Sequence, residues 1–299
     1  MPRLRHKFGT TLLLLSTLLF CHVAMADKAK QETGKQDTSL PANANDLVRK
    51  AVQNESQTSA GTEFHSWKMR QVKPNRTNVR QFVETPDGLI ARTISINDKP
   101  LTDEERAKEE ARINRLLDPK QMQQKRKEQS EDEKRTRRMV AALPDAFIYT
   151  YAGTEEKNGH KLVNLTFKPN PNFSPPTREA LVYQGMEGTM VIDATAMRMA
   201  KIDGTMFRDV SIGWGIIGHL DKGGRFIVEQ SEVDKGDWEI TMMRLNFTGK
   251  ALLFKSIRID ETDVSTDFKK VPKMTVAQAL DYLKKADQNG AVAAKENFK

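Results

Sequence analysis

The chain has 299 residues, a formal net charge of +8 and one cysteine, with 29% charged and 38% hydrophobic residues. One cysteine cannot pair within the chain, so a disulfide scaffold is excluded. Beyond the first 25 residues no apolar run approaches the ~20 residues of a membrane span, so a membrane bundle is excluded too.

Residues 1–26 have the layout of a secretory signal peptide. Three basic residues come first, residues 12–20 form a short apolar core, and an A-x-A cleavage site occupies 24–26. The apolar core is too short for a membrane anchor, and Phe20 before Cys21 does not suit a lipoprotein signal. We therefore predict export to the periplasm, with cleavage lowering the charge from +8 to +5 and removing the cysteine.

A flexible linker is predicted over 27–45, because this polar segment has no apolar periodicity. A short helix should follow, since apolar residues then recur at helical spacing. Alternating residues predict strands over 63–72, 77–85 and 89–96. The last two flank a Pro-Asp-Gly turn at 86–88, which predicts a hairpin.

Residues 102–142 have the composition of a helical insertion. Thr102 and Glu105 fit a capping box, and Asp118-Pro119 starts a second helix. Basic and acidic residues interleave, which favours a salt-bridged solvent face and leaves a docking arm as the alternative. The candidate partner-docking residues are Lys134, Arg135, Arg137 and Arg138. We predict two exposed helices.

The sequence pattern predicts β-strands again from residue 146 to residue 271. Strands are predicted at 147–153, 161–168, 188–193, 197–203, 225–233, 238–247 and 252–260, with an Asn-Gly hairpin turn at 158–159 and a helical turn near 177–183. The spacing of the turns indicates an antiparallel sheet of eight or nine strands. A helix and a loose tail are predicted over 275–299.

Most candidate catalytic, cofactor-binding and metal-binding motifs lack the surrounding sequence that such sites require. Residues 213–218 match G-x-G-x-x-G, but no helix can follow and no parallel βαβ unit surrounds them. His65, His160 and His219 have no metal-ligand spacing, so no metal is expected. The acidic run 260–263 is interpreted as a solvated turn. No nucleophile pattern occurs, so we predict no enzyme activity and no cofactor.

One apolar face of the strands is the remaining candidate site. Such a face must be covered by helices or by a ligand, and Met and aromatic residues suit an adaptable lipid groove. The predicted ligand-binding residues are Trp67, Met69, Ile94, Leu165, Phe167, Met190, Ile192, Phe226, Val228, Trp238, Ile240, Met242 and Ile257.

A family resemblance rests on the runs Gly188–Asp193, Ala200–Gly204, Lys222–Phe226 and Thr266–Val271, together with Trp238. These resemble the strands of the outer-membrane lipoprotein-sorting proteins, the LolA/LolB-like superfamily of periplasmic lipid carriers. The resemblance implies an α+β, mainly antiparallel β fold: a curved half-barrel sheet covered by helices. The expected LolA-like domain is 46–274, with 102–142 as a helical insertion.

The sequence thus predicts a non-enzymatic periplasmic carrier or sensor that binds a lipid or lipoprotein acyl chain. The alternative is an envelope scaffold with a fully covered sheet, whose charged insertion binds a protein partner. Outside the signal and the insertion the charge is near +3, which is too small for a nucleic-acid partner.

Overall fold

The computed structural model describes residues 40–58, 63–212, 218–251 and 255–285. In chain order the elements are α1 (Ala44–Thr58), β1 (Phe64–Lys73), β2 (Arg76–Thr85), β3 (Gly88–Ile96), β4 (Lys99–Pro100), α2 (Asp103–Asn114), η1 (Arg115–Leu117), α3 (Pro119–Ala146), β5 (Phe147–Lys157), β6 (His160–Pro169), η2 (Glu179–Gly185), β7 (Met186–Asp193), β8 (Arg198–Met206), β9 (Val210–Ile212), β10 (Gly218–Leu220), β11 (Arg225–Asp234), β12 (Asp237–Ala251) and β13 (Lys255–Val271). A last helix spans 276–285. The predicted signal peptide, most of the linker, all but the last residue of the 213–218 motif, and the tail lie outside the described residues.

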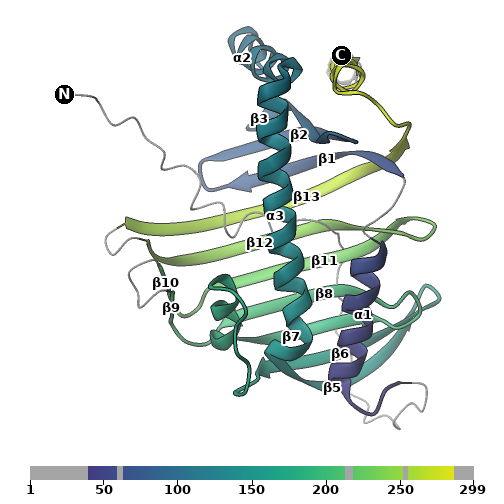
Figure 1. Cartoon of the computed structure of the whole chain (residues 1–299), viewed down its shortest axis with the longest axis vertical. Coiled ribbons are helices and arrows are strands. Elements are labelled where there is room, and N and C mark those ends of the chain that lie inside the picture. The colour runs from purple at the N-terminus through teal and green to yellow at the C-terminus, as the bar shows by residue number, and fades with distance from the viewer. Residues whose placement is uncertain (1–39, 59–62, 213–217, 252–254, 286–299) are drawn as a thin grey trace.

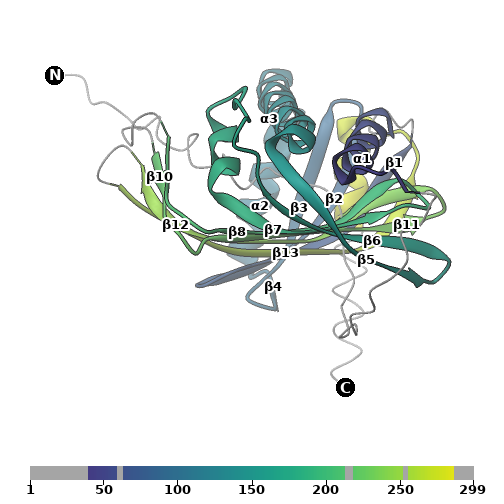
Figure 2. The same cartoon turned by 90° about the horizontal axis from the view of Figure 1, so that it is seen from below.

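All strands belong to one antiparallel sheet. Its order is β4-β3-β2-β1-β13-β12-β11-β8-β7-β6-β5, and β10 pairs with β12 and β9. The sheet is curved and open, and α1 and α3 lie on its concave side (Figures 1 and 2). The predicted α+β class, with a curved antiparallel sheet covered by helices, is therefore confirmed.

α3 crosses the strands from the β3 edge to β5 (Figure 1). Asp118 caps its start and Pro119 occupies the first turn, as the sequence predicts. Its apolar residues cluster at the two ends: Met122 is buried near the start, and Met139 and Leu143 near the end. The prediction of exposed helices therefore holds for the middle of α3 and is wrong for its ends, which pack into the core.

The side chains of α2 and α3 cap the outer edge of β3. Glu109 accepts the Thr93 backbone N–H at 2.6 Å, and Arg112 donates to the Ala91 carbonyl at 2.5 Å. Lys125 and Gln129 both donate to the Leu89 carbonyl. An uncapped strand edge can pair with other chains, so the insertion protects this side of the sheet.

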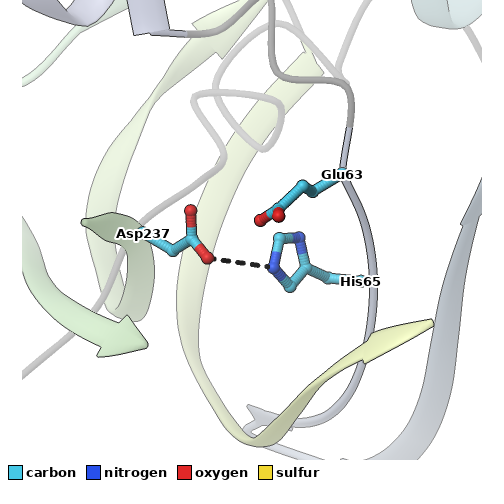
Figure 3. A group of neighbouring side chains, drawn as sticks. All are labelled: Glu63, His65 and Asp237. Atoms are coloured by element: carbon cyan, nitrogen blue, oxygen red, sulfur yellow. Dashed lines mark ion pairs between the residues drawn. The ribbon is translucent and has the colours of Figure 1, made fainter. Parts of the chain in front are cut away.

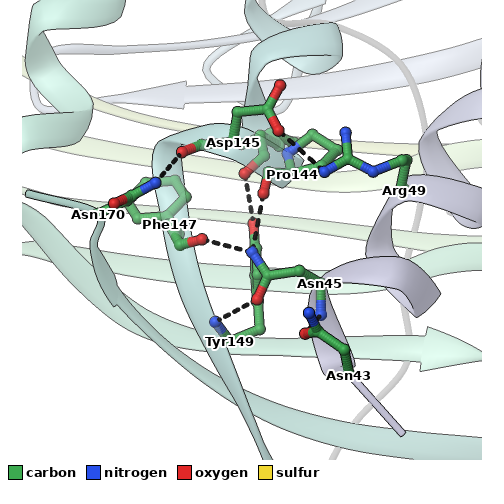
Figure 4. Close-up of polar contacts among 9 residues, drawn as sticks. Asn43, Asn45, Arg49, Pro144, Asp145, Phe147, Tyr149 and Asn170 are labelled. Atoms are coloured by element: carbon green, nitrogen blue, oxygen red, sulfur yellow. Dashed lines mark hydrogen bonds and ion pairs between the residues drawn. The ribbon is translucent and has the colours of Figure 1, made fainter. Parts of the chain in front are cut away.

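Asn45, near the start of α1, performs the same task at the opposite edge (Figure 4). Its amide nitrogen donates to the carbonyls of Phe147 and Pro144 at 2.7 and 2.9 Å, and its oxygen accepts the Tyr149 N–H at 3.1 Å. One side chain thus takes the place of a neighbouring strand at the start of β5 and fixes α1 to the end of α3.

The last helix begins with a reciprocal cap. The hydroxyl of Thr275 accepts the Gln278 N–H, and the Gln278 side chain accepts the Thr275 N–H. Leu280 and Leu283 of this helix pack with Val83 and Ile90 in a second hydrophobic cluster. The predicted terminal helix is therefore part of the folded body.

β13 is longer than predicted. It runs through the supposed acidic turn at 260–263, where Glu261 and Asp263 are 6% and 4% exposed. The prediction of a solvated turn is wrong because β12 pairs with β13 continuously through this stretch and β1 covers part of it. Of the described residues, no helix is both long and apolar enough to cross a membrane.

Candidate functional site

The concave face of β5 to β8 forms the floor of the main core. Leu165, Phe167, Met190 and Ile192 are at most 1% exposed. They pack in one cluster with apolar residues of α1, the end of α3 and η2. Alternation along a strand places these side chains on one face, as the sequence indicates. In this structure the helices, not solvent, cover them.

An apolar strip continues this floor toward the centre of the sheet, across β8, β11, β12 and β13. Val228 pairs with Ile202 on one side and Met243 on the other, while Phe247 pairs with Ile259. Ile202, Val228 and Ile259 are only half-buried, whereas Met243 and Phe247 are 1% exposed. Three residues of the strip therefore keep part of their apolar surface exposed.

Phe226 belongs to the same strip, and its ring lies over Gly204 of the adjacent strand β8. It pairs with Gly204, where a Cβ atom would come within 2.3 Å of the Phe226 ring. Gly204 in turn pairs with Gly188. Gly204 thus leaves room for the Phe226 ring against the β8 backbone, and Gly188 lets β7 approach the Asp203–Gly204 backbone closely.

α3 reaches across the strip but is fixed mainly at its ends. Its principal contacts are with α1, β5 and η2 at the C-terminal end and with β3 at the N-terminal end. The Tyr183 hydroxyl donates to the Met139 carbonyl and the Tyr149 hydroxyl to the Leu143 carbonyl, which anchors the C-terminal end. The residues between the two ends are mostly exposed and polar.

Beyond the strip, the concave face becomes polar on β13 and β1. Glu261 accepts a hydrogen bond from Gln71 and pairs with Lys73 at 3.0 Å. Burial, followed by the adjacent Glu261, raises the pKa of Asp263 to about 7. The concave face therefore has an apolar half and a half with buried charged groups, which strand alternation alone could not distinguish from an acidic turn.

Trp67, Met69 and Ile94 lie outside the strip, on β1 and β3, whereas Ile257 shares the face of Ile259 on β13. Trp67 and Met69 are buried on β1, where the Trp67 ring stacks between Phe82 and Phe268 at centroid distances of 5.2 and 5.8 Å. Ile94 is half-buried and has no partner on β2, because a bulge interrupts that register. Ile257 is half-buried opposite Gly249.

A second bulge separates the predicted residues of β12. Gln230 pairs with Ile240, but Glu229 pairs with Met242, so the register shifts between them. Met242 consequently lies on the opposite face from Ile240, and the next residue, Met243, is the one in the core cluster. Trp238, at the strand start, is half-buried beside the His160 ring at 6.1 Å. Ile240 and Met242, placed together by simple alternation, do not share a face.

The predicted docking residues lie along the exposed part of α3. Lys134 pairs with Glu131 and Arg135 with Asp132, both at 2.9 Å within the helix. Arg137 and Arg138 are exposed. Arg138 also lines a surface pocket of about 540 Å³ at the end of α3, whose wall includes Ala142, Asn170, Phe173 and Thr177.

No protein-family model and no curated protein matches the chain. Three solved structures are similar to it. A DUF1329 family protein from Desulfovibrio piger has a TM-score of 0.30 and 11% identity, covering 79% of this chain and 97% of that chain. A LolA superfamily protein from Nitrosomonas europaea has a TM-score of 0.28 and 9% identity, covering 80% and 98%.

The third is an outer membrane lipoprotein-sorting protein domain from Vibrio parahaemolyticus, with a TM-score of 0.25, 10% identity and coverage of 79% and 99%. Two of these three descriptions name the LolA superfamily or lipoprotein sorting.

Proposed function

We propose that this protein is a periplasmic carrier or sensor that binds a lipid or a lipoprotein acyl chain on the concave face of its sheet. The observation that carries the proposal is the half-buried apolar strip of Ile202, Phe226, Val228 and Ile259, which borders a fully buried apolar floor. A flexible apolar chain fits such a surface better than a rigid polar ligand does.

The position of α3 supports this assignment. The helix is anchored at both ends and is mostly polar between them, so its middle crosses the strip with few apolar side chains of its own. An acyl chain lying beneath it would contact Phe226 and Val228. Burial contributes ~0.8 kcal/mol per CH₂ group, so even a partly inserted chain of about ten carbons gains about 8 kcal/mol before ordering costs.

A signal-peptide pattern at 1–26 supports export, and an exported apolar-binding protein suits the transfer of lipids through an aqueous compartment. Binding alone, without catalysis, accounts for these features. We therefore propose a non-enzymatic role that needs no cofactor.

The second candidate is an envelope scaffold that binds a protein partner through α3. It is favoured by one observation: Leu165, Phe167, Met190 and Ile192 are already covered by the protein's own helices. In that case the partner-docking residues would be Lys134, Arg135, Arg137 and Arg138, on the exposed part of the helix.

Lipid extraction tests the carrier proposal directly. The natively purified protein is extracted with organic solvent for mass spectrometry, and binding of a fluorescent fatty acid is titrated. Phe226→Asp should abolish binding, because a carboxylate would be desolvated against the acyl chain. Thr248→Asp, on an exposed position of β12, is the matched control and should bind like wild type.

Two results would decide between the candidates. A folded protein that yields no lipid and binds no fatty acid contradicts the carrier proposal. Retention of envelope proteins that is lost in the double variant Arg137→Glu, Arg138→Glu, with no lipid binding in either protein, would favour the scaffold. Circular dichroism and thermal melting establish that each variant is folded.

A further inference from the structure

A cluster of charged side chains gathers where the start of β1 meets the β11–β12 hairpin (Figure 3). Glu63 directly precedes β1, His65 lies in β1, and Asp237 is the first residue of β12. Lys270 of β13 pairs with His65 in the strand register. The fold therefore joins residues that are more than 170 positions apart in the sequence.

The imidazole of His65 is held in one orientation. Its side chain is 9% exposed, and its Nδ1 atom lies 3.6 Å from a Glu84 oxygen that also accepts the His65 backbone N–H at 2.8 Å. The Nε2 atom points to Asp237, with 3.7 Å between it and Oδ2. Among the described residues, Nε2 makes no hydrogen bond. A buried ring nitrogen without a hydrogen bond is costly, so this atom needs a ligand or a closer partner.

Carboxylates outnumber the cations around this ring. The Lys270 ammonium lies 2.8 Å from both Glu63 and Asp237 and 3.2 Å from Asp234. One lysine therefore balances three carboxylates, and its side chain is 40% exposed. A long, flexible and partly solvated lysine can leave such a position, whereas the buried imidazole cannot.

We propose that Glu63, His65 and Asp237 form a binding site for a divalent transition metal ion of the zinc type. Each residue offers one ligand atom, and the three atoms lie within 4.8 Å of one another. Imidazole nitrogen and carboxylate oxygens bind zinc at about 2.0–2.2 Å, which puts two ligands of a tetrahedral ion about 3.3 Å apart. The 3.7 Å between His65 and Asp237 is already close to that spacing.

The remaining geometry follows from the side chains. Glu63 is exposed and has three rotatable bonds, so it can close the last distance. Glu84 at Nδ1 provides the outer carboxylate that commonly orients a metal-binding histidine. Lys270 occupies the cation position in competition with the metal and would turn toward solvent on binding. The bound ion would join the start of β1 to the β11–β12 hairpin.

The test measures Zn²⁺ affinity by calorimetry and the visible spectrum of the Co²⁺ form, using full-length protein without a histidine tag. We expect one equivalent to bind. Glu84→Gln should weaken binding about 10- to 100-fold, and His65→Gln by more than that. Lys270→Met should tighten binding by at least about tenfold, since the competing charge is gone. Lys269→Met removes the same charge from an exposed neighbouring position and should leave the affinity unchanged.

Several results would overturn the site. They are no binding by the wild type, unchanged affinity in His65→Gln, a Lys270→Met variant that binds no tighter, or loss of binding in His219→Gln, whose histidine lies elsewhere near Asp209 and Asp221. Should His65→Gln fail to fold, Asp237→Asn replaces it with the same expected loss, and the gain in Lys270→Met is read independently.

Discussion

Asp263 is a buried carboxyl group whose ionisation should oppose folding. It is 4% exposed, and its Oδ1 atom makes no hydrogen bond to any described residue. Burial is the main reason that its pKa is raised to about 7 from 3.8, and Glu261 is the second. Asp263→Asn removes the charge and keeps the shape, so it should stabilise the protein at neutral and alkaline pH.

The direction in which stability changes with pH follows from the number of protons that the folded and unfolded states bind. Between pH 3.8 and about 7 the folded protein holds a proton on Asp263 that the unfolded chain has released, so stability falls as the pH rises through this window. The gap between the two pKa values corresponds to an upper limit of about 4 kcal/mol, at about 1.4 kcal/mol per pKa unit. We expect Asp263→Asn to gain about 2–4 kcal/mol at pH 8 and about two-fifths as much at pH 5.

Urea unfolding of wild type and variant at pH 5, 6.5 and 8 measures this difference. Asp260→Asn is the matched control, because Asp260 lies on the same strand with a 34% exposed side chain. Its effect should be small at every pH. A gain from Asp263→Asn that does not change with pH, or a loss of stability at pH 8, would refute the account of Asp263.

Three further substitutions test the packing of the fold. Asn45→Ala should lower the free energy of unfolding by about 2–3 kcal/mol, since three hydrogen bonds to the backbone are lost; Gln53→Ala, exposed on the same helix, should match wild type in the same urea titration. Gly188→Ala should cost about 3 kcal/mol or prevent folding, because the new Cβ would lie 1.9 Å from a backbone carbonyl oxygen of β8; a wild-type melting temperature would contradict this close contact. Glu109→Ala should cost about 2 kcal/mol and promote association through the uncapped β3 edge, measured by light scattering. Glu104→Ala, exposed on the same helix, should leave both stability and the monomer unchanged.

Local signals in the sequence predicted most of the individual elements. The Asn158-Gly159 turn has the positive φ angles, 53° and 82°, that its residue types favour, and it joins β5 to β6. Thr102 and Glu105 form the predicted capping box at the start of α2. These features depend on contacts between residues close in the chain, so residue type and spacing are sufficient to predict them.

The sheet order and the facing of several strands depended on distant contacts. β1 pairs with β13, about 200 residues later, and this pairing changes the acidic run at 260–263 from a turn into the middle of a strand. The bulge beside Met242 reverses the alternation on β12, because one extra residue shifts every later side chain to the other face. The amino-acid composition of β12 does not predict where such a bulge occurs.

The sequence by itself determined the element types, the turns, and an apolar face on an antiparallel sheet. The tertiary structure alone decided which apolar residues the helices bury and which remain half-buried in the strip. It also decided that His65 meets Asp237, although neither lies in a recognisable ligand spacing. The physical reason is that local conformation depends on neighbours along the chain, whereas burial and the grouping of charged side chains depend on which distant strands pair.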